Sequence, residues 1–105
     1  MFIKWFNEIG LKDINLVGGK NASLGEMVSN MSKLDIRVPY GFAVTTVAYD
    51  RFIEDNGLNL FIQNELAKLQ FDYSLVNLKR TGMKIRNKIL EGSFNTEIET
   101  SITEA

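Results

Sequence analysis

Two glycines and a lysine, Gly18-Gly19-Lys20, stand directly before a run with the apolar spacing of a helix. The first turn of a helix has unpaired backbone N–H groups and about half a positive elementary charge, so it attracts anions and repels cations. A lysine at this position stabilises the helix poorly, but it strengthens the attraction for phosphate. The segment therefore predicts a site for a polyphosphate, with Lys20 as its main ligand and Gly18 and Gly19 as weaker contributors.

The spacing of these residues matches neither of two common phosphate-binding motifs. Residues 13–17 contain no glycine that could begin the motif G-x-x-x-x-G-K-[ST], and the pattern G-x-G-x-x-G is absent as well. The alternative interpretation is a glycine turn followed by an amphipathic helix whose first lysine points into water. On the spacing alone, both interpretations stay open.

The composition limits the chemistry that the 105 residues can perform. The sequence has neither cysteine nor histidine, so it lacks disulfides, thiolate or imidazole metal ligands and a Ser-His-Asp triad. Twelve basic and 13 acidic residues give a net charge of −1, which provides no argument for binding nucleic acid or an anionic membrane. The early charges exclude a signal peptide, and no apolar run is long enough to span a membrane, so we expect a cytoplasmic protein.

Short strands and one long helix are expected to hold the glycine–lysine segment. Residues 2–6 predict a short strand, and residues 11–17 predict a loop or turn with a second short strand as an option. Residues 20–34 predict a helix in which Gly25 allows close approach of another backbone or a ligand. The apolar face of this helix is expected to contain Leu24, Met27, Val28, Met31 and Leu34.

A turn, a strand and a helix are expected next. Residues 38–41 predict a turn around Pro39, and residues 42–45 predict a buried strand. Thr46 is expected to cap a helix over residues 47–56, which the pair Asn56-Gly57 would end.

The second half of the chain predicts three further helices. The first covers residues 59–69, with Ile62, Leu66 and Leu69 on one side. Asp72 or Ser74 would cap the second, which runs to about Leu90 and stops at Gly92. Its apolar seam is expected to hold Leu75, Leu78, Gly82, Ile85 and Ile89, with Gly82 at a tight helix crossing. A capping box over residues 96–99 would open the last helix, with Ile98 and Ile102 on one face.

These elements add up to an α-rich α+β fold with about five helices and two or three short strands. So few strands do not form a stable open sheet alone. The last predicted helix also reaches the end of the sequence without a capping residue. We therefore expect residues 1–105 to be a single partial domain of a natural chain that continues and packs against more protein.

Three other groups of residues are weaker candidates. The basic residues Lys79, Arg80, Lys84, Arg86 and Lys88 favour a solvated helix face, before a docking face for an acidic partner domain and, third, nucleic acid. Glu8, Asp13 and Glu26 favour surface or capping roles over magnesium binding, and Ser23 with Glu26 fits a capping box. Phe42, Tyr49 and Phe52 favour core packing over stacking on adenine.

Three segments resemble the N-terminus of the phosphoenolpyruvate synthase family, the pyruvate, water dikinases. They are residues 5–8, residues 17–27, and residues 38–46 with Ala48-Tyr49. The resemblance covers essentially the whole chain and is strong from residue 5 to residue 56. Pyruvate phosphate dikinases and rifampicin phosphotransferases look similar but usually differ after the lysine.

The resemblance implies the start of an ATP-grasp type nucleotide-binding domain. In the family, ATP passes its β-phosphoryl group to a histidine on a separate swivelling domain. That histidine phosphorylates pyruvate, and the products are phosphoenolpyruvate, AMP and phosphate, with magnesium required. The family lysine that contacts the ATP phosphates falls on Lys20.

The family's other functional groups have no counterpart in these residues. Its nucleotide-binding arginine, magnesium ligands, phosphorylated histidine and pyruvate-binding barrel are all missing. The resemblance thus implies ATP and the rest of the same polypeptide as partners, with no catalytic residue or metal ligand here and no activity for this piece alone. Two alternatives stay open: a stand-alone binding or docking module, and the ATP-binding half of a rifampicin phosphotransferase-like enzyme.

Overall fold

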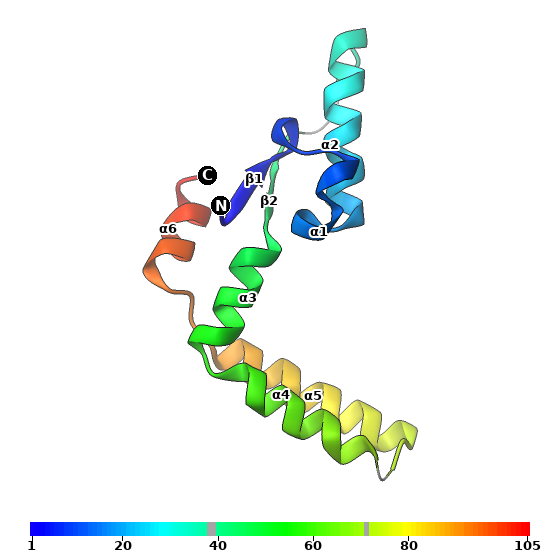
Figure 1. The fold of residues 1–105 in the computed structure, drawn as a ribbon, viewed down its shortest axis with the longest axis vertical. Helices are drawn as coiled ribbons and strands as arrows, with labels where there is room; N and C mark the ends of the chain where they lie inside the picture. The colour runs from blue at the N-terminus through cyan, green and yellow to red at the C-terminus, as the bar shows by residue number, and fades with distance from the viewer. Residues whose placement is uncertain (38–39, 71) are drawn as a thin grey trace. The chain divides into compact units, whose positions relative to one another are not determined.

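A computed structural model describes residues 1–37, 40–70 and 72–105. Helices dominate these residues, and the two strands among them form one antiparallel sheet (Figure 1), which confirms the predicted α-rich α+β class. The chain folds into two compact units. The first comprises residues 1–50 and 96–105, and the second comprises residues 51–95.

The sheet of the first unit joins β1 (Ile3–Trp5) to β2 (Phe42–Val44), so the strands predicted over residues 2–6 and 42–45 are both confirmed. Lys4 lies opposite Ala43 in the antiparallel register. The Phe6 N–H donates to the Gly41 carbonyl at 2.9 Å and continues the pairing beyond Trp5. Of the turn predicted over residues 38–41, Val38 and Pro39 lie outside the described residues.

Residues 11–17 are helical, so the prediction of a loop or a second strand there is wrong. They form the 3-10 helix η2 (Leu11–Asp13) and the short helix α1 (Ile14–Val17). The Asp13 carboxylate accepts the Gly10 N–H at 2.9 Å, and the Asp13 N–H donates to the Gly10 carbonyl at 2.9 Å. These two local bonds close a helical turn and satisfy groups that a strand would have to pair elsewhere.

The long helix predicted over residues 20–34 is confirmed as α2 (Gly19–Met31), followed by the 3-10 helix η3 (Ser32–Leu34). Its predicted apolar face is wrong in part, because Met27 and Leu34 are exposed. The buried positions of α2 are Ala22, Gly25 and Val28.

Small residues line this face because another backbone lies directly against it. A side-chain carbon at Gly25 would overlap the carbonyl oxygen of Ile9, which confirms the predicted close approach. Ile9, Val17, Ala22 and Ala43 form the local core, with Phe6 and Leu16 packed on it.

Thr45, not Thr46, caps helix α3 (Thr46–Asp55). The Thr45 hydroxyl accepts the Ala48 N–H at 3.4 Å, while the Thr46 hydroxyl donates to the Asn15 carbonyl at 3.0 Å. Both threonines suit a cap, and Thr45 takes the role because β2 ends directly before it. Gly57 has φ +63°, the left-handed conformation predicted for the end of this helix.

Helix α6 (Thr96–Thr103) belongs to the first unit. Ile98 is fully buried and packs with Phe2 and Ala48, and Ile102 lies against the same cluster, so its predicted apolar face is confirmed. The predicted capping box requires Thr96 to be the residue before the helix. In the structure Thr96 is instead the first residue of α6.

The second unit is built on two neighbouring helices, α4 (Leu58–Ala67) with the 3-10 helix η4 (Lys68–Gln70), and α5 (Leu75–Glu91) (Figure 1). Both helices confirm the predicted segments. Ser74 caps α5 by accepting the Asn77 N–H at 3.3 Å. Asp72 in turn accepts the Ser74 N–H at 2.9 Å, so Ser74 is the cap and Asp72 supports it.

The predicted apolar seams of these two helices are wrong in part. Leu66, Leu75 and Leu78 are exposed. The buried positions of α4, η4 and α5 are Leu58, Glu65, Leu69 and Thr81. The pattern misleads because the inner face carries a carboxylate and a hydroxyl in place of aliphatic side chains.

Glycine also acts differently in α5 than predicted. Among the described residues outside the backbone of α5, a side-chain carbon at Gly82 would come within 4 Å of Arg86 alone, on the same helix, so the predicted tight crossing there is wrong. The helix ends before Gly92, as predicted, with this residue at φ −71°. Glycine is needed at 92 because a side-chain carbon would lie 2.7 Å from Cζ of Phe52.

Candidate functional site

The glycine–lysine segment forms the junction between α1 and α2. Gly18 ends α1 by donating its N–H to the Ile14 carbonyl at 2.8 Å, and its carbonyl accepts the Ala22 N–H of α2 at 3.0 Å. Its φ of +83° lies in the region that side chains disfavour. A side-chain carbon at Gly18 or Gly19 would meet no other side chain or distant backbone within 4 Å in the described part of the chain, so the space in front of the helix is open.

Lys20 is the second residue of α2 and is exposed, as the segment predicts. Among the described residues, no carboxylate lies within ion-pair distance of its ammonium group. The first N–H groups of a helix have no acceptor within it, and they carry the positive end of the helix dipole. The junction thus combines open space, unpaired donors and an unpaired cation, which is an arrangement that favours an anion.

Asn21 holds this junction in place, although the spacing argument does not single it out. Its side-chain amide donates to the Val17 carbonyl at 2.9 Å and ties the first turn of α2 to the last residue of α1. The sequence signals this bond only once α1 is known to end at Val17, four residues before Asn21.

The three acidic candidates around the junction act as caps. Glu8 accepts the Trp5 N–H at 3.0 Å, and Glu26 accepts the Leu11 N–H at 2.9 Å. Asp13 bonds to Gly10 as described above. The predicted capping role is confirmed, but the capping box of Ser23 with Glu26 is wrong, because Ser23 lies inside α2 and Glu26 caps η2 instead.

These carboxylates do not fit a magnesium site. Each uses an oxygen on a backbone N–H, and Glu26 also accepts the Asn30 amide at 3.2 Å. Within residues 1–37, 40–70 and 72–105, no group of three or more Asp, Glu, His or Cys residues could hold a metal ion.

The aromatic candidates are engaged in packing in two of three cases. Phe42 lies edge-on to Trp5 at 5.3 Å, and Phe52 lies against Phe94 at 5.4 Å between ring centroids. Tyr49 is exposed, so the expectation that it packs in the core is wrong.

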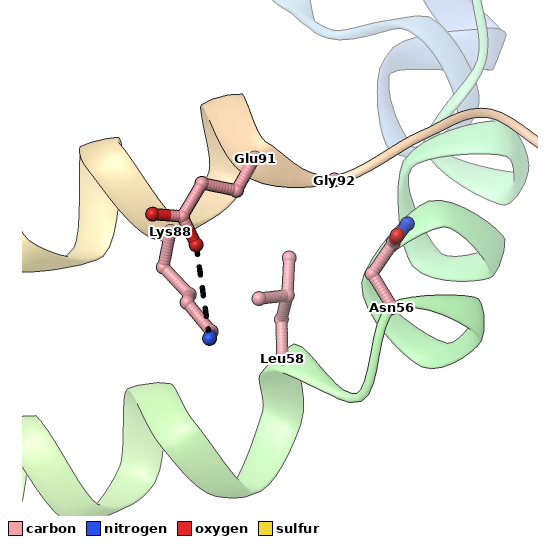
Figure 2. A pocket seen from close by; sticks show the side chains of 5 residues that line it. All are labelled: Asn56, Leu58, Lys88, Glu91 and Gly92. Atoms are coloured by element: carbon pink, nitrogen blue, oxygen red, sulfur yellow. Dashed lines mark ion pairs between the residues drawn. The ribbon is translucent and has the colours of Figure 1, made fainter.

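A cavity of about 140 Å³ lies in the second unit between Asn56, Leu58, Lys88, Glu91 and Gly92 (Figure 2). The ammonium group of Lys88 lies 3.8 Å from the Glu91 carboxylate. The Asn56 side chain is fully bonded, since it donates to the carbonyls of Phe52 and Ser93 and accepts the Ser93 N–H. Pockets for drug-sized ligands measure roughly 300–1,000 Å³, so this cavity is too small for a nucleotide. The polar side chains that line it are also already bonded to one another or to the backbone.

The basic face of α5 is partly paired. Lys84 lies 3.8 Å from Glu65, and Lys88 lies 5.5 Å from the ring centre of Phe61. All five basic residues of the helix are nevertheless exposed, which confirms the prediction of a solvated face. Among the described residues, no helix has both the length and the apolar character to cross a lipid bilayer.

The chain belongs to the family described as pyruvate phosphate dikinase, AMP/ATP-binding domain, which matches residues 14–105 and so includes the whole junction. Among curated relatives, the chain is similar to the phosphoenolpyruvate synthase of Escherichia coli (strain K12), with 41% identity over 103 residues, or 98% of this chain. The resemblance found in the sequence is thereby confirmed.

Two other relatives carry the same name. The phosphoenolpyruvate synthase of Neisseria meningitidis serogroup B is 41% identical over 104 residues, or 99% of this chain. That of Enterobacter agglomerans is 48% identical over 52 residues, which cover 50% of this chain and 85% of that relative. The chain spans about 13% of the length of the Escherichia and Neisseria proteins.

Proposed function

We propose that residues 1–105 are the opening part of the ATP-binding domain of a phosphoenolpyruvate synthase, and that Lys20 binds the phosphates of ATP. The observation that carries this proposal is the family match over residues 14–105, which contains an open helix start with an unpaired lysine. In this proposal the residues form one partial domain, and the complete domain is of the ATP-grasp type.

The proposed enzyme converts pyruvate, ATP and water to phosphoenolpyruvate, AMP and phosphate. The β-phosphoryl group of ATP moves first to a histidine, which another domain must supply because this sequence has none. The role of Lys20 is electrostatic: its charge offsets the negative charge on the phosphoryl oxygens as the group moves. Gly18 and Gly19 contribute by leaving the helix start free of side chains.

Magnesium is part of the proposed reaction, but the described residues do not offer a site for it. Its ligands would have to come from elsewhere in the enzyme, as would the pyruvate site. The partners of this piece are therefore ATP and the rest of the same polypeptide. Because ATP and pyruvate are cytoplasmic metabolites, the proposed reaction belongs in the cytoplasm.

Lys20→Ala in the full-length enzyme tests the proposal. We expect the phosphorylation of the enzyme by ATP to slow by about 10²- to 10⁴-fold, because one charge on the transferring group is lost. Transfer from the phosphohistidine to pyruvate should keep its rate, since it takes place on other domains. Lys20→Arg should rescue only part of the loss, because a planar guanidinium does not replace a compact ammonium group.

Lys33→Ala is the matched control, because Lys33 is an exposed lysine that follows the other end of the same helix. It should leave both half-reactions unchanged. An ATP half-reaction within about threefold of wild type for Lys20→Ala would mean that Lys20 is an ordinary surface lysine, since a threefold change corresponds to only about 0.7 kcal/mol of barrier height.

A further inference from the structure

Asn56 and Gly57 form the one Asn-Gly pair of the sequence, and they join α3 to α4. The side chain of an asparagine is chemically least stable before a glycine, because glycine has no side chain to keep its backbone nitrogen away from the asparagine amide. That nitrogen can attack Cγ of the asparagine. The pair is therefore a place at which the chain can modify itself, at a rate that depends on how the fold holds the two reacting groups.

Hydrogen bonds hold both reacting groups in the structure. The Asn56 amide nitrogen donates to the carbonyl of Phe52 at 2.8 Å and to that of Ser93 at 2.9 Å. The Asn56 side-chain oxygen accepts the Ser93 N–H at 3.0 Å. These three side-chain bonds form a clamp between the end of α3 and the segment after α5. The Gly57 N–H in turn donates to the Glu54 carbonyl at 3.1 Å, so the attack requires this bond and the clamp to open.

The surroundings of the clamp offer space for water and no space for a side chain at Gly92. Asn56 lines the cavity of about 140 Å³ (Figure 2), and a buried water needs only roughly 15 Å³ of such space. A side-chain carbon at Gly92 would lie 3.1 Å from Cγ of Asn56 and 2.7 Å from Cζ of Phe52. The clamp therefore keeps its geometry only while residue 92 is a glycine.

We propose that Asn56 is a site of spontaneous deamidation, that the clamp suppresses the reaction, and that the clamp cannot close again afterwards. In the first step the Gly57 nitrogen loses its proton and bonds to Cγ of Asn56, while the bond from Cγ to Nδ2 breaks and ammonia leaves. Water then opens the resulting five-membered ring at either carbonyl, and residue 56 becomes aspartate or isoaspartate. This inference does not depend on the proposed function.

The new carboxylate cannot replace the amide in the clamp. It has no N–H group for the carbonyls of Phe52 and Ser93, so its oxygen would face two other acceptors. It also adds a negative charge at the carboxyl end of α3, where the helix dipole disfavours one. Asp55 already places a carboxylate there, 3.3 Å from Arg51. Loss of ammonia makes the change permanent, and two of the three clamp bonds are lost with it.

Deamidation of the full-length polypeptide, native and unfolded in guanidinium chloride, tests the proposal. Trypsin releases residues 52–68 as one peptide, in which Asn59 and Asn64 serve as internal references, and mass spectrometry distinguishes the sites. Asn56 should react fastest in the unfolded chain. Folding should slow its reaction by at least about tenfold, because the attack requires local opening.

Gly92→Ala should speed the native reaction at least about fivefold, because the added methyl group displaces Phe52 and Asn56. Gly82→Ala is the matched control on the same helix. In the described part of the chain its added carbon would approach only the end of the Arg86 side chain, at 3.3 Å, so the native rate should not change.

Asn56→Asp mimics one product of the reaction and measures its effect on the fold. Amide hydrogen exchange in residues 92–95 should become at least about fivefold faster, because the clamp holds this segment. Asn59→Asp is the control, since it adds the same charge in the first turn of α4, outside the clamp, and should leave that exchange unchanged.

Three results would each overturn the proposal: equal deamidation of Asn56 in the native and unfolded chains, a faster reaction at Asn59 or Asn64 in the unfolded chain, or unchanged hydrogen exchange in Asn56→Asp. A folded Gly92→Ala variant with the wild-type rate would overturn it as well. If Gly92→Ala does not fold, the wild-type comparison and Asn56→Asp still decide the question.

Discussion

Lys20 occupies a position in α2 where a positive charge is electrostatically unfavourable. A cation in the first turn of α2 is repelled by the positive end of the helix dipole, and no carboxylate in the described residues compensates it. Lys33 has the opposite position, just beyond the carboxyl end of α2, where a cation is favourable. The two lysines therefore form a natural pair for separating a binding role from a structural one.

Lys20→Ala should raise the free energy of unfolding by about 0.3–1 kcal/mol, while Lys33→Ala should lower it by a similar amount. Urea denaturation of the two variants at low ionic strength measures both values. High salt should shrink both effects, because it screens exposed charges. Equal destabilisation by both variants would show that the dipole does not govern these positions.

Gly25→Ala should destabilise the first unit by about 1–3 kcal/mol, because the added methyl group overlaps the backbone of Ile9. Gly19→Ala is the control, since that position is open and helical and its φ is not positive. Alanine there should be neutral or stabilise by up to about 1 kcal/mol. Thermal unfolding of both variants decides the point, and equal stabilities would exclude the close contact.

The ends of helices can be predicted from local sequence signals more reliably than the side of each helix that is buried. Glycines and Ser74 mark the ends of helices through a single bond or one backbone angle, which a sequence reveals directly. The buried face depends on what lies opposite, so Met27 and Leu34 look like core residues until Ile9 is seen to leave room only for Gly25. The sequence pattern of residues 11–17 misleads for a related reason, because the caps from Asp13 and Glu26 outweigh it.

On α4, Glu65 is the clearest example of a buried residue that the apolar pattern does not predict. It is buried, and it accepts a hydrogen bond from Lys68 at 3.0 Å while Lys84 lies 3.8 Å away. The bond from Lys68 lowers the pKa of Glu65 below its ordinary value of 4.5, with the charges of Lys68 and Lys84 in support and burial in opposition.

The second unit should therefore lose stability in acid. A carboxyl group with a lowered pKa in the folded state contributes stability above pH 4.5, and this contribution disappears as the pH falls through the folded value. Denaturation at a series of pH values should show the loss below pH 4.5. Glu65→Gln should flatten that part of the profile, whereas Glu104→Gln, at an exposed position, should not.

At the scale of the whole molecule, residues 14–105 match an AMP/ATP-binding domain, and the sequence lacks the histidine that the proposed reaction needs. The purified chain should show no pyruvate-dependent formation of AMP, because it contains no histidine to carry the phosphoryl group. It should bind ATP with a Kd above about 100 μM, since one lysine and one helix end supply few contacts. Isothermal titration and an AMP assay check both values, and submicromolar binding would favour a stand-alone binding module.

The family and the start of α2 at the glycine–lysine segment were both accessible from the sequence, because they depend on residues that are close together in the chain. The phosphate role of Lys20 stays a prediction, since the groups that would meet it there belong to the proposed remainder of the enzyme.

Gly18 serves as the last hydrogen-bonded residue of α1 and the first acceptor of α2, so no spare residue separates the two helices. Adding or removing one residue there would turn everything that follows in α2 by about 100° around the helix axis. The same turn would move Lys20 away from its place and swing Gly25 off Ile9, bringing a larger side chain against that backbone. The spacing at Gly18 thus fixes two things together: the direction of Lys20 at the proposed phosphate site and the contact of Gly25 with Ile9 in the core. An insertion or deletion there would disturb both.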